Sequence, residues 1–327
     1  MRSKLIKPIE YERLAKMRLM EMTQYLQEHE YKEEIDKLGL EYSGVELLEN
    51  ALRKNLVKVF NRLKTISNAS TQVLIMQYLK RMDVWNVKTI IRGRYAKKSK
   101  EDIIKMLLPA GTLNSHDLNL LVRHESVKKI LQSLKFINYS YLERGYEFYK
   151  KNNSLALIEN LLDMHYYNDL LQFSRSLPEQ GRVLKQFLEI EVDFLNIKNL
   201  IKSRALEIDL GEFMIYPGSR LQLKELVKLK DTSSLIKILK KSCYGRMLGS
   251  TLEAYHKKKD LAQIELEMDK FMYKKILDTP NIFPLSTDTI LLYMFGKEIE
   301  IRNLLMLAKA KQMRMPESFI KENLIAG

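Results

Sequence analysis

The residues with the clearest chemical potential are an acid, an asparagine and a base that recur three times along the chain. The three copies comprise Asp83, Asn86 and Arg94; Asp193, Asn196 and Arg204; and Glu300, Asn303 and Lys311. Such groups form hydrogen bonds and ion pairs. Within each copy the acid and the base are eleven residues apart, which is about 16 Å along a straight helix. They therefore cannot pair with each other, and each needs a partner on another helix or in water.

Each set falls on one face when the segment is placed on an α-helix. The same face carries a small residue and several aliphatic side chains; the small residues are Gly93, Ser203 and Ala310. The opposite face varies between the copies; in the first copy it holds Trp85, Lys88, Thr89 and Arg92. The matching face is therefore predicted to be the packed one.

Two interpretations of the polar set remain open. In the first, the small residue lets a neighbouring helix approach, and the asparagine and the acid bind backbone groups of that neighbour, because buried polar groups need partners. In the second, the acid or the base lines a central cavity and contacts another protein.

The spacing of the copies predicts a modular chain. The three asparagines are 110 and 107 residues apart, far longer than the units of solenoid proteins, which span about 20–50 residues. We predict three similar helical-bundle modules around a pseudo-threefold axis, at residues 1–115, 116–222 and 223–327. A second repeat supports this prediction: the loop Leu108-Pro-Ala-Gly-Thr-Leu113 resembles Tyr216-Pro-Gly-Ser-Arg-Leu221, and the third module lacks such a loop.

The composition predicts an all-α protein. The 327 residues are 46% hydrophobic, with only 12 Gly and 7 Pro, which favours helices over sandwiches or barrels. Hydrophobic periodicity predicts one long helix at residues 9–37, and a capping box of Ser43 and Glu46 predicts another at 44–65. Single helices are also predicted at 117–134, 155–177, 183–204, 250–276 and 288–313. Others are expected from about Ser70 into the first motif, and at 97–108, 141–152 and 233–239. Pro316 is expected at the first position of a last short helix.

Motifs for catalysis or cofactor binding are missing. The sequence has no GxxxxGK phosphate loop, no HExxH, no GxSxG and no cluster of Cys and His. We therefore expect no catalytic, cofactor or metal site. The single cysteine, Cys243, excludes a disulfide within the chain and suits a reducing compartment. No apolar stretch approaches the ~20 residues of a membrane helix, and the start of the chain lacks the apolar region of a secretory signal.

The charge balance raises nucleic acid or another anionic partner as a possibility. The formal net charge is +14, but the basic residues are scattered and their densest clusters, 256–259 and 97–100, are not interleaved with aromatic residues. A solvated surface is the simpler interpretation, and nucleic acid is disfavoured as a partner.

The triple motif and its Pro-Gly loops resemble the C subunit of archaeal and bacterial A/V-type ATP synthases, and they are equally similar to the d subunit of vacuolar ATPases. The resemblance rests on Met82–Arg94 with the loop at Pro109, on Leu188–Arg204 with the loop at Pro217, and on Ile299–Lys311. It covers roughly residues 9–324. The third copy departs from the pattern, with Glu300, Lys311 and no Pro-Gly loop.

The resemblance implies a non-catalytic part of the rotary central stalk: an all-α, funnel-shaped socket of three modules at the cytoplasmic face of the cell membrane. Such a component joins the shaft made by the D and F subunits to the membrane rotor ring of proteolipid subunits. It transmits torque for proton or sodium transport. The alternatives are a basic all-α scaffold that binds RNA or another acidic partner, and an enzyme with dispersed site residues. Co-purification with a membrane ATPase, a salt-sensitive nucleic-acid shift or a deep pocket of titratable groups would distinguish the three.

Overall fold

The computed structural model describes residues 5–177, 182–206, 214–215, 219–258, 260–279 and 287–326. Seventeen α-helices and no β-strand occur in these ranges, which confirms the all-α prediction. The first nine helices are α1 (Pro8–Lys16), α2 (Leu19–Gln27), α3 (Lys32–Leu38), α4 (Gly44–Ile66), α5 (Ala69–Tyr95), α6 (Lys100–Met106), α7 (Ser115–Arg123), α8 (Val127–Gln132) and α9 (Tyr139–Asn152). The others are α10 (Ala156–Arg175), α11 (Arg182–Leu206), α12 (Leu223–Lys228), α13 (Thr232–Lys241), α14 (Gly245–Lys258), α15 (Leu261–Asp278), α16 (Thr287–Gln312) and α17 (Glu317–Asn323).

The chain forms two compact units, each built from segments distant in sequence. The first unit comprises Met1–Phe60, Glu179–Phe187 and Asp231–Gly327, and the second comprises Asn61–Pro178 and Leu188–Lys230. Both ends of the sequence thus belong to the first unit. The three sequence modules stay a prediction.

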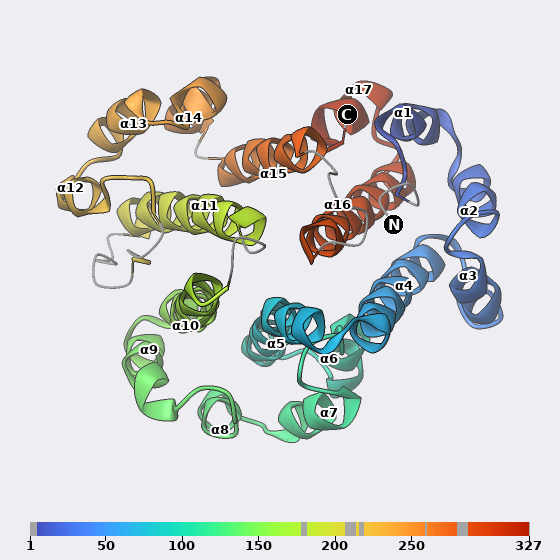
Figure 1. Cartoon of the computed structure of the whole chain (residues 1–327), viewed down its shortest axis with the longest axis horizontal. Helices are drawn as coiled ribbons and strands as arrows, with labels where there is room; N and C mark the ends of the chain where they lie inside the picture. The colour runs from blue at the N-terminus through green and yellow to red at the C-terminus, as the bar shows by residue number, and fades with distance from the viewer. Residues whose placement is uncertain are drawn as a thin grey trace. The chain divides into compact units, whose positions relative to one another are not determined.

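The second unit is organised around α5, the helix of the first motif. Helices α6, α7, α8 and α10 pack against it, and Figure 1 shows α6 and α7 at its side. Its apolar positions Leu79, Val87, Ile90 and Ile91 are inaccessible to solvent. Gly93 allows the close approach of α6, because a Cβ atom at this position would lie 2.5 Å from the Ile103 side chain.

The first unit has α16, the helix of the third motif, as its most buried element. Helices α2, α15 and α17 pack against it. Every residue from Thr289 to Lys297 is buried. A helix that is buried on all sides lies inside a core rather than at a surface.

Three helices predicted without a break are divided, and these predictions are wrong. Residues 9–37 form α1, α2 and α3; residues 117–134 form α7 and α8; and residues 250–276 belong to α14 and α15. The first break lies at Met17 and Arg18, whose backbone is extended. There Glu21 accepts the Arg18 N–H at 2.7 Å and restarts a helix. No glycine or proline marks this break, so the hydrophobic periodicity predicted a single helix that continues across it.

Side chains that cap the next helix stabilise the breaks before α8 and α15. Ser126 accepts the Lys129 N–H at 3.3 Å in front of α8, and Asp260 accepts the Ala262 N–H at 2.9 Å in front of α15. The remaining predicted helices are confirmed within a few residues. Pro316 precedes α17 as its N-cap, one position earlier than expected. Pro178, which the sequence placed after α10, lies outside the described residues.

The helices of the first and third motifs end in the same way. Lys97 and Arg314 adopt positive φ angles of 54°. The next residue in each case, Lys98 or Met315, donates its N–H to the Gly93 or Ala310 carbonyl at 2.9 Å. This pattern is the Schellman motif, in which a left-handed residue closes the helix. The shared ending indicates that the two copies repeat in structure as well as in sequence.

Replacing Lys97 by Gly should stabilise the protein. A left-handed conformation is disfavoured for residues with a Cβ and costs nothing extra for glycine. We expect the free energy of unfolding to rise by about 0.5–1 kcal/mol, measured by urea unfolding. Asn153, which has a φ of 49° at the end of α9, is the matched control, because asparagine already tolerates this conformation. A larger gain from Asn153→Gly than from Lys97→Gly would contradict the argument.

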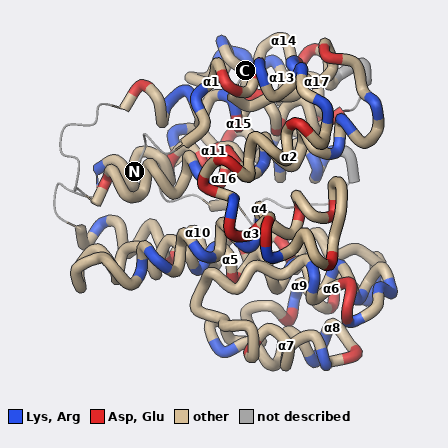
Figure 2. Tube along the Cα trace, turned by 90° about the vertical axis from the view of Figure 1, so that its right-hand side faces the viewer, with Lys and Arg blue, Asp and Glu red and all other residues tan. Residues whose placement is uncertain are grey.

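Lys and Arg residues are spread along the helices, with Asp and Glu residues between them (Figure 2). Many of the lysines and arginines form ion pairs with these acids; examples are Lys37–Glu33, Arg81–Glu191 and Arg302–Asp269. The side chains of the cluster at 256–259 lie outside the described residues.

Candidate functional site: three clamps on the motif helices

The first clamp consists of Asp83, Asn86 and Arg94 on α5. The Asp83 side chain is buried, with 1% of its surface exposed. Its carboxylate accepts the backbone N–H and the hydroxyl of Thr112 at 2.9 and 2.7 Å, and the backbone N–H of Leu113 at 2.9 Å. Burial raises the pKa of Asp83, whereas these hydrogen bonds and the nearby Lys64 act in the opposite direction. Asp83 therefore fixes the chain just before α7.

The other two members of the first clamp also bind backbone groups. Asn86 donates its amide to the Leu108 carbonyl at 2.7 Å and accepts the Leu108 N–H at 2.8 Å. Arg94 donates to the carbonyl of Val122, in the last turn of α7. The three side chains together hold one continuous stretch that runs from the end of α6 to the end of α7.

Gly111 allows this close approach. A Cβ atom added to Gly111 would lie 2.1 Å from Asp83 Oδ1. Lys64 donates hydrogen bonds to the Ala110 carbonyl at 3.2 Å and to the Gly111 carbonyl at 3.4 Å. The glycine of the Pro-Ala-Gly loop is thus required by the contact with the motif acid, which the sequence did not reveal.

The second clamp, on α11, repeats this arrangement. Asp193 accepts the Ser219 hydroxyl and, at 3.1 Å, the Arg220 N–H. Asn196 exchanges two hydrogen bonds with the backbone of Ile215, at 2.9 and 3.0 Å. Arg204 donates to the Val227 carbonyl at 2.7 Å, near the end of α12. The predicted loop residues 216–218, and 213 before them, lie outside the described residues; the described Met214 and Ile215 are not in a strand.

The third clamp, on α16, binds the two ends of the sequence. Asn303 accepts the Ile325 N–H at 2.8 Å. Lys311 donates to the carbonyl of Ala15 at 2.9 Å and to that of Met17, at the end of α1. Burial lowers the pKa of Lys311. The base of the third copy therefore holds the last turn of α1 as Arg94 holds the last turn of α7.

Glu300, the acid of the third clamp, has a different set of partners. It accepts the Ile6 N–H at 2.6 Å, the Tyr31 hydroxyl, and a hydrogen bond from Lys297 at 2.7 Å. Lys297 also contacts Tyr31, with Nζ 4.2 Å from the ring centroid and 2.9 Å from the hydroxyl. All three side chains are buried. Burial and the Glu300 carboxylate raise the pKa of Tyr31 well above its usual range, so this hydroxyl stays protonated and donates.

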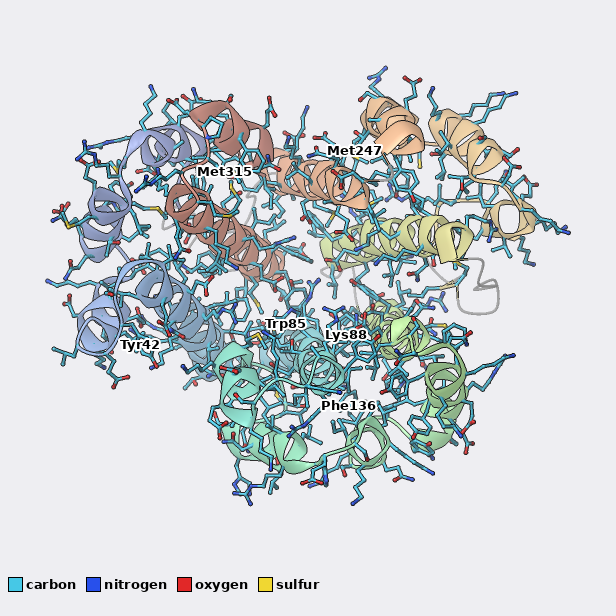
Figure 3. All side chains as sticks on the ribbon, turned by 180° about the vertical axis from the view of Figure 1, so that it is seen from behind. Tyr42, Trp85, Lys88, Phe136, Met247 and Met315 are labelled. Atoms are coloured by element: carbon cyan, nitrogen blue, oxygen red, sulfur yellow. The ribbon has the colours of Figure 1, made fainter. Side chains whose placement is uncertain are left out.

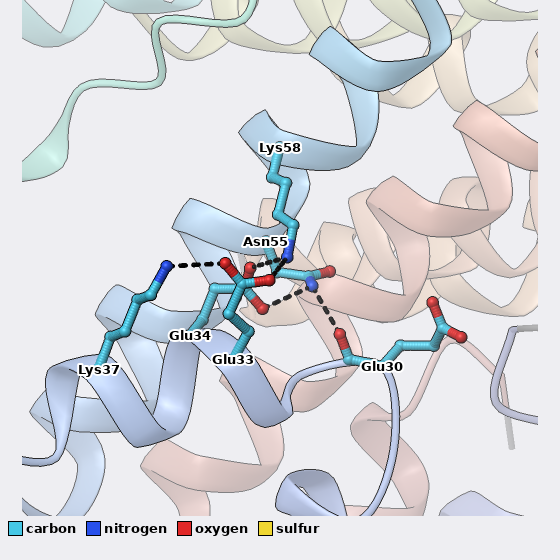
Figure 4. A network of polar contacts seen from close by, with 6 residues as sticks. All are labelled: Glu30, Glu33, Glu34, Lys37, Asn55 and Lys58. Atoms are coloured by element: carbon cyan, nitrogen blue, oxygen red, sulfur yellow. Dashed lines mark hydrogen bonds and ion pairs between the residues drawn. The ribbon is translucent and has the colours of Figure 1, made fainter. Parts of the chain in front are cut away.

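A second polar network fixes the backbone that carries Tyr31 (Figure 4). The buried Asn55 of α4 donates to the Glu30 carbonyl at 2.8 Å and to the Glu34 carboxylate at 3.0 Å. Lys58, one turn later, binds the same carboxylate at 2.9 Å and also pairs with Glu33. These contacts tie the start of α3 to α4 and so set the position of the Tyr31 hydroxyl.

The three clamps follow one rule. Each acid binds the chain immediately before a short helix, and each base binds a carbonyl in the last turn of that helix; the short helices are α7, α12 and α1. Because the final carbonyls of a helix lack partners within the helix and carry partial negative charge, a base is favoured there. The acid–base spacing of about 16 Å on the motif helix thus accommodates a short helix laid alongside it.

Lys297 and Tyr31 are the residues of this site that the sequence analysis missed. The available signal was the i, i+3 spacing of Lys297 and Glu300 directly after the apolar run 290–296, because charges next to such a run need partners when they are buried. Nothing near Tyr31 in the sequence indicates that it would meet α16.

The face of α5 opposite the first clamp is more exposed and contacts α10 through ion pairs. Lys88 pairs with Asp163, and Arg92 binds Glu159 with two hydrogen bonds of 2.6 and 2.7 Å. Trp85 on the same side is 37% exposed; Figure 3 labels Trp85 and Lys88 on this helix. The repeated face of α5 is the buried one, as predicted, whereas the opposite face contacts α10 through partly exposed ion pairs.

The clamp residues bind backbone groups of the same chain. The three acids and the three asparagines are at most 2% exposed. No group of three or more His, Cys, Asp or Glu that could hold a metal ion occurs in the part of the chain that the structure describes. None of the helices in the described ranges is both long and apolar enough to cross a membrane.

Replacing Asn86 by Leu should destabilise the protein by about 1–3 kcal/mol, because the half-buried Leu108 N–H and carbonyl would both lose their partner. Asn196→Leu should cost a similar amount, since Ile215 depends on Asn196 in the same way. Thermal unfolding followed by circular dichroism measures both. Asn50, which binds the Glu46 carbonyl on the exposed surface of its own helix, is the control. Equal effects of Asn50→Leu and Asn86→Leu would contradict the role assigned to the clamp.

The sequence of this chain is similar to those of known proteins over almost its whole length. Residues 1–323 match the family described as ATP synthase (C/AC39) subunit. The A-type ATP synthase C subunit of Archaeoglobus fulgidus is 31% identical, over 99% of this chain and 93% of the relative. The protein of the same name from Haloquadratum walsbyi is 30% identical, over 96% and 92%. That from Methanosarcina mazei is 28% identical, over 99% and 90%.

Proposed function

Because the chain belongs to the ATP synthase (C/AC39) subunit family, we propose that it is a central-stalk component of an A/V-type rotary ATP synthase. In this role it joins the shaft of the D and F subunits to the membrane rotor ring of proteolipid subunits. It transmits torque for the transport of protons or sodium ions, and it lies peripherally at the cytoplasmic face of the membrane. The observation that carries the proposal is the match to this family over residues 1–323.

The family and the relatives are named for one component of a larger complex, and the protein is a non-catalytic one. The clamps fit a mechanical part. A component that transmits torque must resist bending, and each motif helix is fastened to the segment beside it by directional hydrogen bonds to backbone groups. Since closely packed interiors deform little, such fastening stiffens the path along which force passes. We further propose that the three modules expected from the sequence are the repeating parts of this path.

Co-purification and activity measurements test the role. Affinity-tagged chain should recover the ATPase from detergent-solubilised membranes, and membranes lacking the chain should hydrolyse ATP without pumping ions. Adding the purified chain back should restore pumping, whereas the isolated chain should hydrolyse no ATP. Intrinsic ATP turnover, or membranes that pump ions normally without the chain, would overturn the proposal.

The RNA-binding alternative receives a separate test. A chain that binds RNA should shift labelled single-stranded RNA with an affinity that falls steeply as salt rises, because phosphate contacts release counterions. Because the basic residues are scattered along the chain (Figure 2), we expect no such shift of RNA. Tight, salt-sensitive RNA binding without recovery of the ATPase would replace the proposed role by the alternative.

A further inference from the structure

We propose that residues 5–17, the strap, can detach from α16 and α17, the helices that it contacts, while the rest of the first unit stays folded. The strap contains Ile6 and α1, and the third clamp holds it at both ends, through Glu300 and Lys311. The helices held by the first and second clamps, α7 and α12, are fastened more completely. Two features of the third clamp cause this difference.

The first feature is covalent continuity. In the first clamp, Asn86 holds Leu108 and Asp83 holds Thr112, in the same loop. In the second clamp, the residues held by the asparagine and the acid are again close in sequence. In the third clamp, Asn303 holds Ile325, whereas Glu300 holds Ile6 from the other end of the sequence. Asn86 and Asn196 therefore hold segments that lead directly into α7 and α12. Asn303 holds a segment at the other end of the sequence from α1.

The second feature is what remains bound to the acid after release. The hydrogen bonds given above for Asp83 all come from Thr112 and Leu113, so loss of that segment would leave a buried carboxylate without them. Glu300 would lose the Ile6 N–H but keep Tyr31 and Lys297. Because an unpaired buried charge is costly, release of the strap is less unfavourable than release of α7. The Tyr31–Lys297 pair is thus what makes the third clamp able to open.

The strap also has natural boundaries. The extended backbone at Met17 and Arg18 separates α1 from α2 and provides a hinge. At the other end, Leu5 lies so close to α16 that a Cβ atom on Gly296 would be 2.6 Å from Leu5 Cδ1. The buried side chains Tyr11 and Leu14 hold α1 in place when the strap is bound. Detachment would expose these side chains and the face of α16 beneath Leu5.

Hydrogen exchange of the 327-residue chain, followed by mass spectrometry, tests the proposal. Amides of α1 should exchange through an opening that leaves α16 protected, and faster than amides of α7. Gly296→Ala should displace Leu5 and increase α1 exchange about tenfold, without faster exchange in α7 or α16. Because alanine favours a helix interior over glycine, this variant is expected to fold. Gly249→Ala in α14, where the nearest atom would be 3.9 Å away, is the control and should leave α1 unchanged.

A matched pair of variants probes the other end of the strap. Lys311→Met removes the donor to Ala15 and Met17, and Arg94→Met removes the equivalent donor to Val122 in α7. If the strap can detach, hydrogen exchange should increase more for α1 in Lys311→Met than for α7 in Arg94→Met. The proposal is overturned if α1 in the unmodified chain exchanges only together with α16, or if these two increases are equal.

Discussion

Replacing Lys297 by Met should lower the free energy of unfolding by about 3–5 kcal/mol, because removal of one partner leaves a buried charge without its counterpart. Lys297 and Glu300 are both 2% exposed as side chains and 2.7 Å apart. Glu300 would keep the Ile6 N–H and the Tyr31 hydroxyl, but it would lose the only charged group among these partners. Urea unfolding of the purified chain measures the effect.

A double-mutant cycle separates the ion pair from general loss of packing. Glu300→Gln removes the negative charge and retains an oxygen that accepts hydrogen bonds. The double variant Lys297→Met with Glu300→Gln buries no charge at this position and should lose clearly less stability than the sum of the two single losses. Lys321→Met on α17 is the control, because Lys321 and Glu317 form an exposed pair and the unfolding midpoint should not move. Additive losses in the cycle would show that Lys297 acts only through its packing.

Replacing Gly111 by Ala should destabilise the second unit by about 2–4 kcal/mol, through steric overlap and loss of hydrogen bonds. The added Cβ would lie 2.1 Å from Asp83 Oδ1 and within 3 Å of the rest of the carboxylate. The loop would have to move away, and the N–H groups of Thr112 and Leu113 would lose their acceptor. Thermal unfolding followed by circular dichroism gives the size of the loss.

Two controls keep the interpretation of Gly111→Ala specific. Gly249→Ala adds the same methyl group where nothing lies closer than 3.9 Å, and it should be neutral or slightly stabilising because it lies inside a helix. Combining Gly111→Ala with Asp83→Ala removes the group that the methyl would strike, so the loop substitution should then cost much less than it does alone. An equal cost of Gly111→Ala in the presence and absence of the Asp83 carboxylate would mean that another contact is responsible.

The helical class and the repeated polar set could be predicted from the sequence because both depend on local patterns. Scarcity of glycine and proline favours helices wherever they lie, and a face shared by three motifs requires a common environment. The helix breaks were less accessible. At Met17 and Arg18 the chain leaves the helix although neither residue is a helix breaker. The Glu21 carboxylate accepts the Arg18 N–H and stabilises the start of α2 there, as Glu10 does for α1 at Lys7.

The sequence by itself determined that Asp83, Asn86 and Arg94, with their counterparts in the other two copies, share a helix face and that the acid and the base of a copy cannot bind each other. Helix geometry alone is sufficient for both conclusions. Only the tertiary structure decided what they do bind. Glu300 meets Ile6 across a sequence separation of 294 residues, and no local rule selects such a partner. The partner depends on which chain end reaches the third motif helix, and that is a property of the packed core as a whole.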